Sequence, residues 1–112
     1  MITMKNLKKL ASLKTLAPAP ANAFWALDKT ALADGAIPRK YKELMAVAVA
    51  LTTQCAYCIE IHRDAALKAG ATEAELAEAI FVAAALRAGA AVTHGAHLLA
   101  CKQEGEAQEA AA

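Results

Sequence analysis

Alanine dominates this chain and narrows what it can fold into. It fills more than a quarter of the 112 positions, far above its usual share. Alanine is the best helix former and is depleted in β-strands. No run of five or more residues alternates apolar and polar side chains with the β-branched enrichment of a strand. We therefore predict an all-α fold whose helices approach one another closely, because their side chains are small.

The length of the chain fits a single domain. A domain of 112 residues buries roughly 65% of its unfolded surface, which is enough for a modest core. We predict one domain over residues 1–112, with an N-terminal amphipathic helix within 1–19 and a frayed tail at 104–112. Most of the short helices are apolar on more than one face, so a monomer would leave hydrophobic surface uncovered. We therefore expect a homo-oligomer.

Charge and hydropathy exclude several classes of partner. The formal net charge is +1 and lysines are interspersed with acids, so no basic stripe predicts nucleic-acid binding. Lys14 and two prolines interrupt what would be the apolar core of an N-terminal signal peptide. The longest apolar run, 79–91, contains Arg87 and falls short of the roughly 20 residues of a membrane span. We expect a cytoplasmic protein without a membrane partner, in a compartment that keeps cysteines reduced.

Apolar periodicity, prolines and glycines together predict six helices. The first should end before a pair of prolines, and the fourth at Gly70, a good C-terminal cap. Thr72 and Glu75 form a capping box that opens the fifth helix, and Gly89 is expected to break or kink it. The helices are expected at about residues 4–16, 21–33, 38–52, 55–70, 72–87 and 90–103.

The segment TTQCAYCIEIH, residues 52–62, carries the first candidate site. Cys55, Cys58 and His62 stand at i, i+3 and i+7, which places them along one face of a helix. A thiol near a base at a helix N-terminus has its pKa lowered toward the thiolate range. The pattern indicates a redox-active dithiol, while a metal clip or a pair of buried thiols remains open.

Glu43 is expected to support this site from the preceding helix. If the third and fourth helices form an antiparallel hairpin that turns at about Thr53, Glu43 and His62 each lie roughly 14 Å from the turn. They would then be level with each other. A carboxylate in an otherwise apolar stretch is costly to bury without a partner, and orienting a histidine is a common role for it. The alternative is a solvated residue on the exposed edge of the helix.

The spacing of these residues resembles the AhpD-like alkyl hydroperoxidase group of the carboxymuconolactone decarboxylase family. Glu43, Cys55, Cys58 and His62 match that group's E-x11-C-x2-C-x3-H pattern. The resemblance extends over roughly residues 20–100. It differs at Tyr57, where better-characterised hydroperoxidases carry a histidine between the two cysteines.

The resemblance implies an AhpD-like helical domain with a thiol-dependent alkyl hydroperoxidase activity. Cys58 would attack the peroxide and become a sulfenic acid, Cys55 would resolve it as a disulfide, and His62 supported by Glu43 would be the base. It implies an external thiol or dithiol electron donor, either a partner protein or a small dithiol, and assembly into trimers or hexamers. It implies no cofactor, whether flavin, haem or metal.

Two other functions are open at this stage. Decarboxylase or lactone chemistry of the larger family requires a basic pocket for a carboxylated substrate, and no arginine or lysine is clearly placed for one. A non-catalytic zinc-binding interaction module would need Cys55, Cys58 and His62 plus a fourth ligand. The candidates for that ligand are Glu43, His94, His97 and Cys101.

His94, His97 and Cys101 also share a helical face at i, i+3 and i+7. We interpret them as a partly buried face with polar tips, and the alternative is that His97 is an auxiliary proton donor in the dithiol pocket. Phe24 and Trp25 are interpreted as core or subunit-contact residues.

Overall fold

Helices joined by short loops make up the part of the chain that the structure describes. A computed structural model describes residues 2–101, and no β-strand occurs among them. The all-α prediction is confirmed. The expected frayed tail at 104–112 lies outside the described residues. In chain order the elements are η1 (Met4–Ser12), α1 (Leu13–Leu16), α2 (Pro18–Leu32), α3 (Arg39–Thr53), α4 (Ala56–Lys68), α5 (Glu73–Gly95) and η2 (Ala96–Leu98), where η marks a 3-10 helix.

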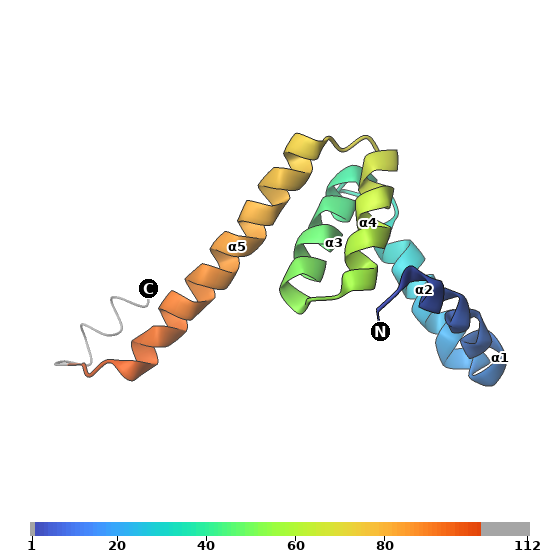
Figure 1. The fold of residues 1–112 in the computed structure, drawn as a ribbon, viewed down its shortest axis with the longest axis horizontal. Coiled ribbons are helices and arrows are strands. Elements are labelled where there is room, and N and C mark those ends of the chain that lie inside the picture. Colours follow the sequence, from blue (N-terminus) through green and yellow to red (C-terminus); the bar gives the residue numbers. More distant parts are fainter. Residues whose placement is uncertain (1, 102–112) are drawn as a thin grey trace.

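An antiparallel hairpin of α3 and α4 forms the centre of the molecule (Figure 1). Gln54 turns the chain between the two helices by adopting a left-handed backbone conformation, with φ 57° and ψ 41°. The Cys55 N–H then donates to the Ala50 carbonyl at 3.1 Å, which satisfies one of the free carbonyls of α3. Val47, Ala50 and Ala66 are buried in the hairpin. Small residues therefore hold α3 and α4 close together, as the alanine content predicts.

Helix α5 begins on the hairpin and then extends beyond it (Figure 1). The predicted capping box is present: Thr72 Oγ1 accepts from the Glu75 N–H, and the Thr72 N–H donates to Glu75 Oε1. Lys40 of α3 pairs with Glu75 at 2.9 Å and ties the first turn of α5 to the hairpin.

The expected break at Gly89 and the sixth helix at 90–103 are wrong, because α5 continues through this glycine to Gly95. A glycine inside a helix costs only about 1 kcal/mol relative to alanine. Alanines on both sides of Gly89 keep the helix intact. Beyond Gly95 only the short η2 follows within residues 2–101.

The N-terminal part also differs from its expected form. In place of a single helix at 4–16, nine residues form the 3-10 helix η1 and only four form α1. Helix α2 begins at Pro18, three residues earlier than expected. Proline fits the first turn of a helix, where its missing N–H has no partner to lose. The two prolines therefore open α2 and do not merely end the segment before it.

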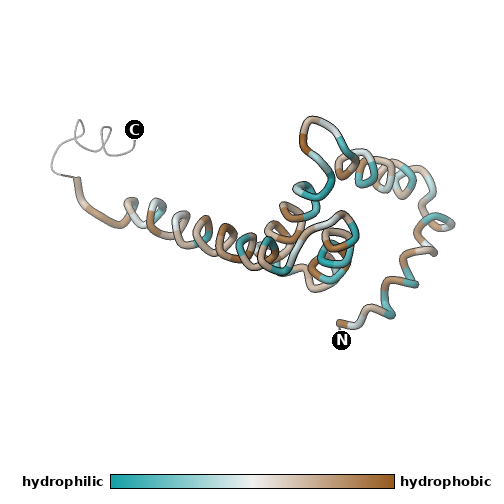
Figure 2. The backbone as a smooth tube through the Cα atoms, turned by 90° about the horizontal axis from the view of Figure 1, so that it is seen from above, coloured by the Kyte–Doolittle hydropathy of each residue, from teal (hydrophilic) through white to brown (hydrophobic). Residues whose placement is uncertain are grey.

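The molecule is open, with much apolar surface uncovered. Its radius of gyration is 19.2 Å, whereas a compact chain of this length has about 13 Å. Helices α1 and α2 extend from one side of the hairpin and α5 from the other (Figure 1). Figure 2 shows hydrophobic segments recurring along the whole of α5, where Phe81, Leu86 and Val92 are exposed.

One stretch of the described chain, Glu73–Leu98, is long and apolar enough to cross a membrane by length and composition alone. The expectation that no stretch is long and apolar enough for a membrane span is wrong by this measure, because the helix remains apolar enough despite Arg87. The same helix packs on α3 of the hairpin. Length and apolar composition are also typical of helices that are covered by other protein surfaces.

Candidate functional site

The start of α4 positions both cysteines of the C-x2-C motif. Cys55 is the N-cap residue, with extended backbone angles, and its Sγ accepts the Cys58 N–H at 3.2 Å. Cys58 lies three residues into the helix, and His62 follows one turn later. Cys58 is thus inside the first turn, as predicted, while Cys55 precedes it. Both sulfurs lie at the positive end of the helix dipole, which favours the thiolate form.

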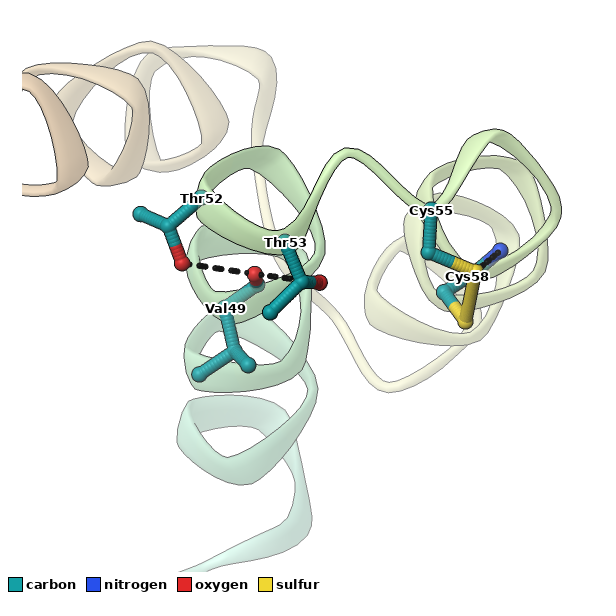
Figure 3. Close-up of a disulfide and its surroundings, with 5 residues drawn as sticks. All are labelled: Val49, Thr52, Thr53, Cys55 and Cys58. Carbon is teal, nitrogen blue, oxygen red and sulfur yellow. Dashed lines mark hydrogen bonds between the residues drawn. A yellow bond between two sulfur atoms is a disulfide. The ribbon is translucent and has the colours of Figure 1, made fainter.

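Cys55 and Cys58 are joined as a disulfide, with Cα atoms 5.3 Å apart (Figure 3). Their side chains point toward each other at the entrance of α4. In the same view, the hydroxyl groups of Thr52 and Thr53 donate to the Val49 carbonyl and complete the end of α3. The turn thus places the two cysteines where their side chains can form a disulfide.

Glu43 and His62 meet across the hairpin, as their equal distance from the turn predicts. His62 Nδ1 lies 2.7 Å from Glu43 Oε2. Glu43 is only 1% exposed, so the alternative of a solvated edge residue is wrong. Arg39 Nε lies 3.6 Å from the other carboxylate oxygen. The buried carboxylate thus has a basic group on each oxygen, which offsets the cost of removing it from water.

This contact determines which nitrogen of His62 is free for chemistry. A carboxylate can only accept, so the Nδ1 atom carries the hydrogen and donates it to Glu43. The Nε2 atom then keeps its lone pair and can take a proton. The His62 side chain is 18% exposed, so the ring is held by Glu43 and still reaches the surface of the hairpin.

A pocket of about 440 Å³ opens beside Cys58 and His62. Cys55 is not part of its lining. Its walls are mostly apolar and come from the end of α2, the loop before α3, and α3 itself. Lys42 also contributes to it. The main apolar lining residues are Leu32, Ile37, Met45, Ala46, Val49 and Ala50.

Sequence reasoning missed this pocket and the part that Lys42 plays in it. The signal was present in the position of Lys42, directly before Glu43 in a helix whose next residues are apolar. An apolar run that includes exposed positions such as Met45 and Val49 is a further sign of a binding surface.

Tyr57, between the two cysteines, links the motif to the N-terminal segment. Its hydroxyl oxygen accepts a hydrogen bond from Asn6 Nδ2 at 3.0 Å, across 51 positions of sequence. This contact holds η1 against the start of α4. The residue between the two cysteines is therefore a phenol with a structural partner.

The second histidine and cysteine group does not join the site. His94 and His97 lie at the end of α5 and in η2, with ring centroids 6.2 Å apart. Both histidines and Cys101 are exposed, so the interpretation of a partly buried face is wrong. That end of α5 points away from the hairpin (Figure 1). Within residues 2–101, no group of three histidine, cysteine or acidic residues is arranged to hold a metal ion. The zinc alternative finds no support in this part of the chain.

Phe24 and Trp25 lie in α2, where their rings meet edge to face at 5.5 Å. They line a separate apolar depression with residues of η1 and α1. Phe24 remains exposed in the single chain, which is consistent with a subunit-contact residue.

Known proteins are similar to this chain in both sequence and fold. The sequence pattern that defines the carboxymuconolactone decarboxylase family matches residues 18–109. The chain is 51% identical over 83 residues to an uncharacterized protein in the cox locus of Paracoccus denitrificans, covering 74% of this chain and 75% of the relative. It is 32% identical over 93 residues to an uncharacterized protein of Cupriavidus necator, covering 83% and 82%.

Two crystal structures have similar folds. One is a protein from Methanobacterium thermoautotrophicum, with a TM-score of 0.68 and 36% identity over 72% of this chain and 93% of that one. The other is an apo carboxymuconolactone decarboxylase family protein from Legionella pneumophila, with a TM-score of 0.72 and 33% identity over 84% of each chain.

Proposed function

Because this chain belongs to the carboxymuconolactone decarboxylase family, we propose that it is a thiol-dependent alkyl hydroperoxidase of the AhpD-like group. The observation that carries the proposal is the Cys55–Cys58 pair, close enough to bond, beside a histidine that a buried carboxylate orients. Such a constellation supplies a nucleophile, a base and a resolving thiol, the groups that a two-cysteine peroxidase needs.

In the first step Cys58 is the attacking residue, because it lines the pocket and Cys55 does not. His62 Nε2 takes the thiol proton, directly or through water. The Cys58 thiolate attacks the terminal oxygen of the hydroperoxide and the O–O bond breaks. The alkoxide leaves with the proton from His62 as an alcohol, and Cys58 becomes a sulfenic acid.

In the second step Cys55 attacks the sulfur of the Cys58 sulfenic acid. The S–O bond breaks, and the departing hydroxide takes the Cys55 proton to form water. The products are the disulfide, one alcohol and one water, so the dithiol gives two electrons to the peroxide. An external thiol or dithiol, on a partner protein or a small molecule, then reduces the disulfide and is itself oxidised. We place this cycle in the cytoplasm, where such donors are maintained.

We also propose that the protein works as a homo-oligomer, a trimer or a hexamer. The open shape and the exposed apolar residues of α5 support this, because a monomer would leave several large apolar side chains in water. Burial between copies would cover α5 more simply than insertion into a membrane.

The test of the proposed function is the thiol state of the reduced protein after a pulse of cumene hydroperoxide, measured by alkylation and mass spectrometry. Wild type is expected to form the Cys55–Cys58 disulfide within the assay, Cys58→Ser to consume no peroxide, and Cys55→Ser to accumulate a sulfenic acid. Cys101→Ser is the matched control, because Cys101 is exposed and outside the motif. Equal peroxide consumption by wild type and Cys58→Ser would refute the assignment.

A decarboxylase of the kind that names the family is the second candidate. The observation in its favour is Lys42, which supplies the pocket with a basic residue that a carboxylated substrate would need. Replacing the thiol separates the two functions without adding bulk to the pocket. A peroxidase loses its activity in Cys58→Ser, whereas a decarboxylase that depends on Lys42 retains it.

A further inference from the structure

The pocket beside Cys58 combines apolar walls with one free cation. Apart from Lys42 and His62, its lining consists of apolar side chains together with Thr53 and Cys58. Apolar walls select a ligand with a hydrocarbon body. A partly buried cation among such walls adds a requirement, because its charge is best satisfied by an anion or a polar acceptor.

Lys42 meets that requirement only in part within the protein. Its Nζ donates to the Ala33 carbonyl at 2.7 Å, at the C-terminal end of α2. Among residues 2–101, Lys42 forms no ion pair with a carboxylate within 4.0 Å. Its neighbour Glu43 is turned away from it, toward His62 and Arg39. The ammonium group is thus held in place by a neutral oxygen and keeps its charge and two further donors for a ligand.

The position of Lys42 relative to Cys58 defines the kind of ligand. Lys42 precedes Glu43, which is level with His62, and His62 lies four residues from Cys58, or about 6 Å along α4. The backbone positions of Lys42 and Cys58 are therefore offset by about one helical turn along the hairpin, with His62 and apolar side chains lining the pocket between them. A molecule that spans them has an anionic group at one end and its reactive oxygen several carbons away.

We propose that this pocket binds a medium-chain aliphatic carboxylate, with Lys42 as the counterion. The substrate class is then a hydroperoxide that carries a carboxylate, of the kind formed by oxidation of fatty acids. This substrate assignment rests on the proposed peroxidase function, whereas the carboxylate site does not. The carboxylate takes no part in the redox step: its role is to fix the O–O bond near Cys58.

Binding of unreactive probes to the oxidised protein tests the site without any turnover. Octanoate and 1-octanol share the same chain length, and the alcohol is the more hydrophobic of the two. Titration by calorimetry or by NMR shifts is expected to show octanoate binding about 10-fold more tightly, the contribution of one charge-assisted hydrogen bond at a half-buried site. Lys42→Met keeps the aliphatic stem and should remove this preference.

Lys68→Met is the matched control, because Lys68 lies on α4, is exposed and does not line this pocket. It should retain the preference for octanoate. A wild type that binds octanoate no better than octanol would overturn the proposal, and so would a preference that survives in Lys42→Met.

Turnover then tests the substrate class. A medium-chain hydroperoxide with a free carboxylate is compared with its methyl ester by kcat/KM. The acid is expected to have a 10-fold higher kcat/KM, and the difference should lie in a lower KM. Lys42→Met should reduce this ratio to about one. Consumption of both at equal rates by wild type would overturn the substrate assignment. If neither is consumed while octanoate is still preferred, the peroxidase proposal fails and the carboxylate site stands.

Discussion

Replacing Glu43 by glutamine tests the ordered contact on which the proposed chemistry depends. Glu43 is 1% exposed and its Oε2 lies 2.7 Å from His62 Nδ1. Glutamine has nearly the same shape, so the hairpin should still form. The substitution removes one negative charge from the only side chain that orients the His62 ring within residues 2–101.

The size of the effect follows from the type of hydrogen bond that is lost. A hydrogen bond to a charged group contributes about 1.5–3 kcal/mol, and a neutral one about 0.5–1.5 kcal/mol. The difference of about 1–2 kcal/mol is largest when His62 has taken the Cys58 proton and is itself charged. At about 1.4 kcal/mol per factor of ten, Glu43→Gln should slow the attack on peroxide by roughly 5- to 30-fold at neutral pH.

The assay is single-turnover disulfide formation in reduced protein, followed by rapid quenching with an alkylating agent. Glu60→Gln is the control, because Glu60 is an exposed acid on the same helix as His62. Above the pKa of an ordinary thiol, about 8.5, the thiolate forms without a base and the defect should shrink. A Glu43→Gln rate equal to wild type at neutral pH would refute the relay, and an unchanged defect at high pH would show that the variant perturbs something other than proton removal.

Two further predictions concern stability and assembly. The hydrogen bond between Lys40 and Glu75 lowers the pKa of the Glu75 carboxyl below 4.5 and raises the pKa of Lys40 above 10.5. The ion pair therefore stabilises the fold above pH 4.5. This stabilisation is lost as the pH falls through the lowered pKa of Glu75, or as it rises through the raised pKa of Lys40. Glu75→Gln retains the capping box with Thr72 and loses only the ion pair with Lys40. Its melting temperature should therefore lie below that of wild type near neutral pH, and the two melting temperatures should converge in acid. A difference in melting temperature that stays constant from pH 7 to 3 would contradict this. Leu86, 67% exposed on α5, should lie between copies, so Leu86→Glu should lower the mass measured by light scattering while the helical circular dichroism is retained; an unchanged mass would exclude this part of α5 from the interface.

The hairpin was predictable because its determinants are local. The 3.6-residue period places Cys58 and His62 on one face, and equal distance from the turn brings Glu43 level with His62. Both rules need only the positions of the helices and one turn. The structure confirms this arrangement, and the catalytic roles of the residues stay predictions.

The pocket and the course of α5 were not predictable in the same way. The pocket is formed by residues of α2, the following loop and α3, and no local rule specifies how α2 lies on the hairpin. Gly89 has a propensity cost that is too small to decide between a break and a continuous helix. The nine-residue 3-10 helix η1 has no strong local signal either, because its leucines and lysines have the spacing of an ordinary amphipathic α-helix.

The exposed face of α3 connects assembly with chemistry. Met45 and Val49 are 51% and 58% exposed, yet both line the pocket that contains Cys58. Met45 also lines a second depression, between α3 and α5, where apolar surface is uncovered. A neighbouring copy that covers this face would close the pocket around its ligand and exclude water from it. Exclusion of water strengthens both the Glu43–His62 contact and the attraction of Lys42 for an anion, because charges interact more strongly at lower dielectric constant. If the protein assembles in this way, a dissociated subunit would retain every residue of the proposed relay but would lack the neighbouring copy that excludes water from the pocket.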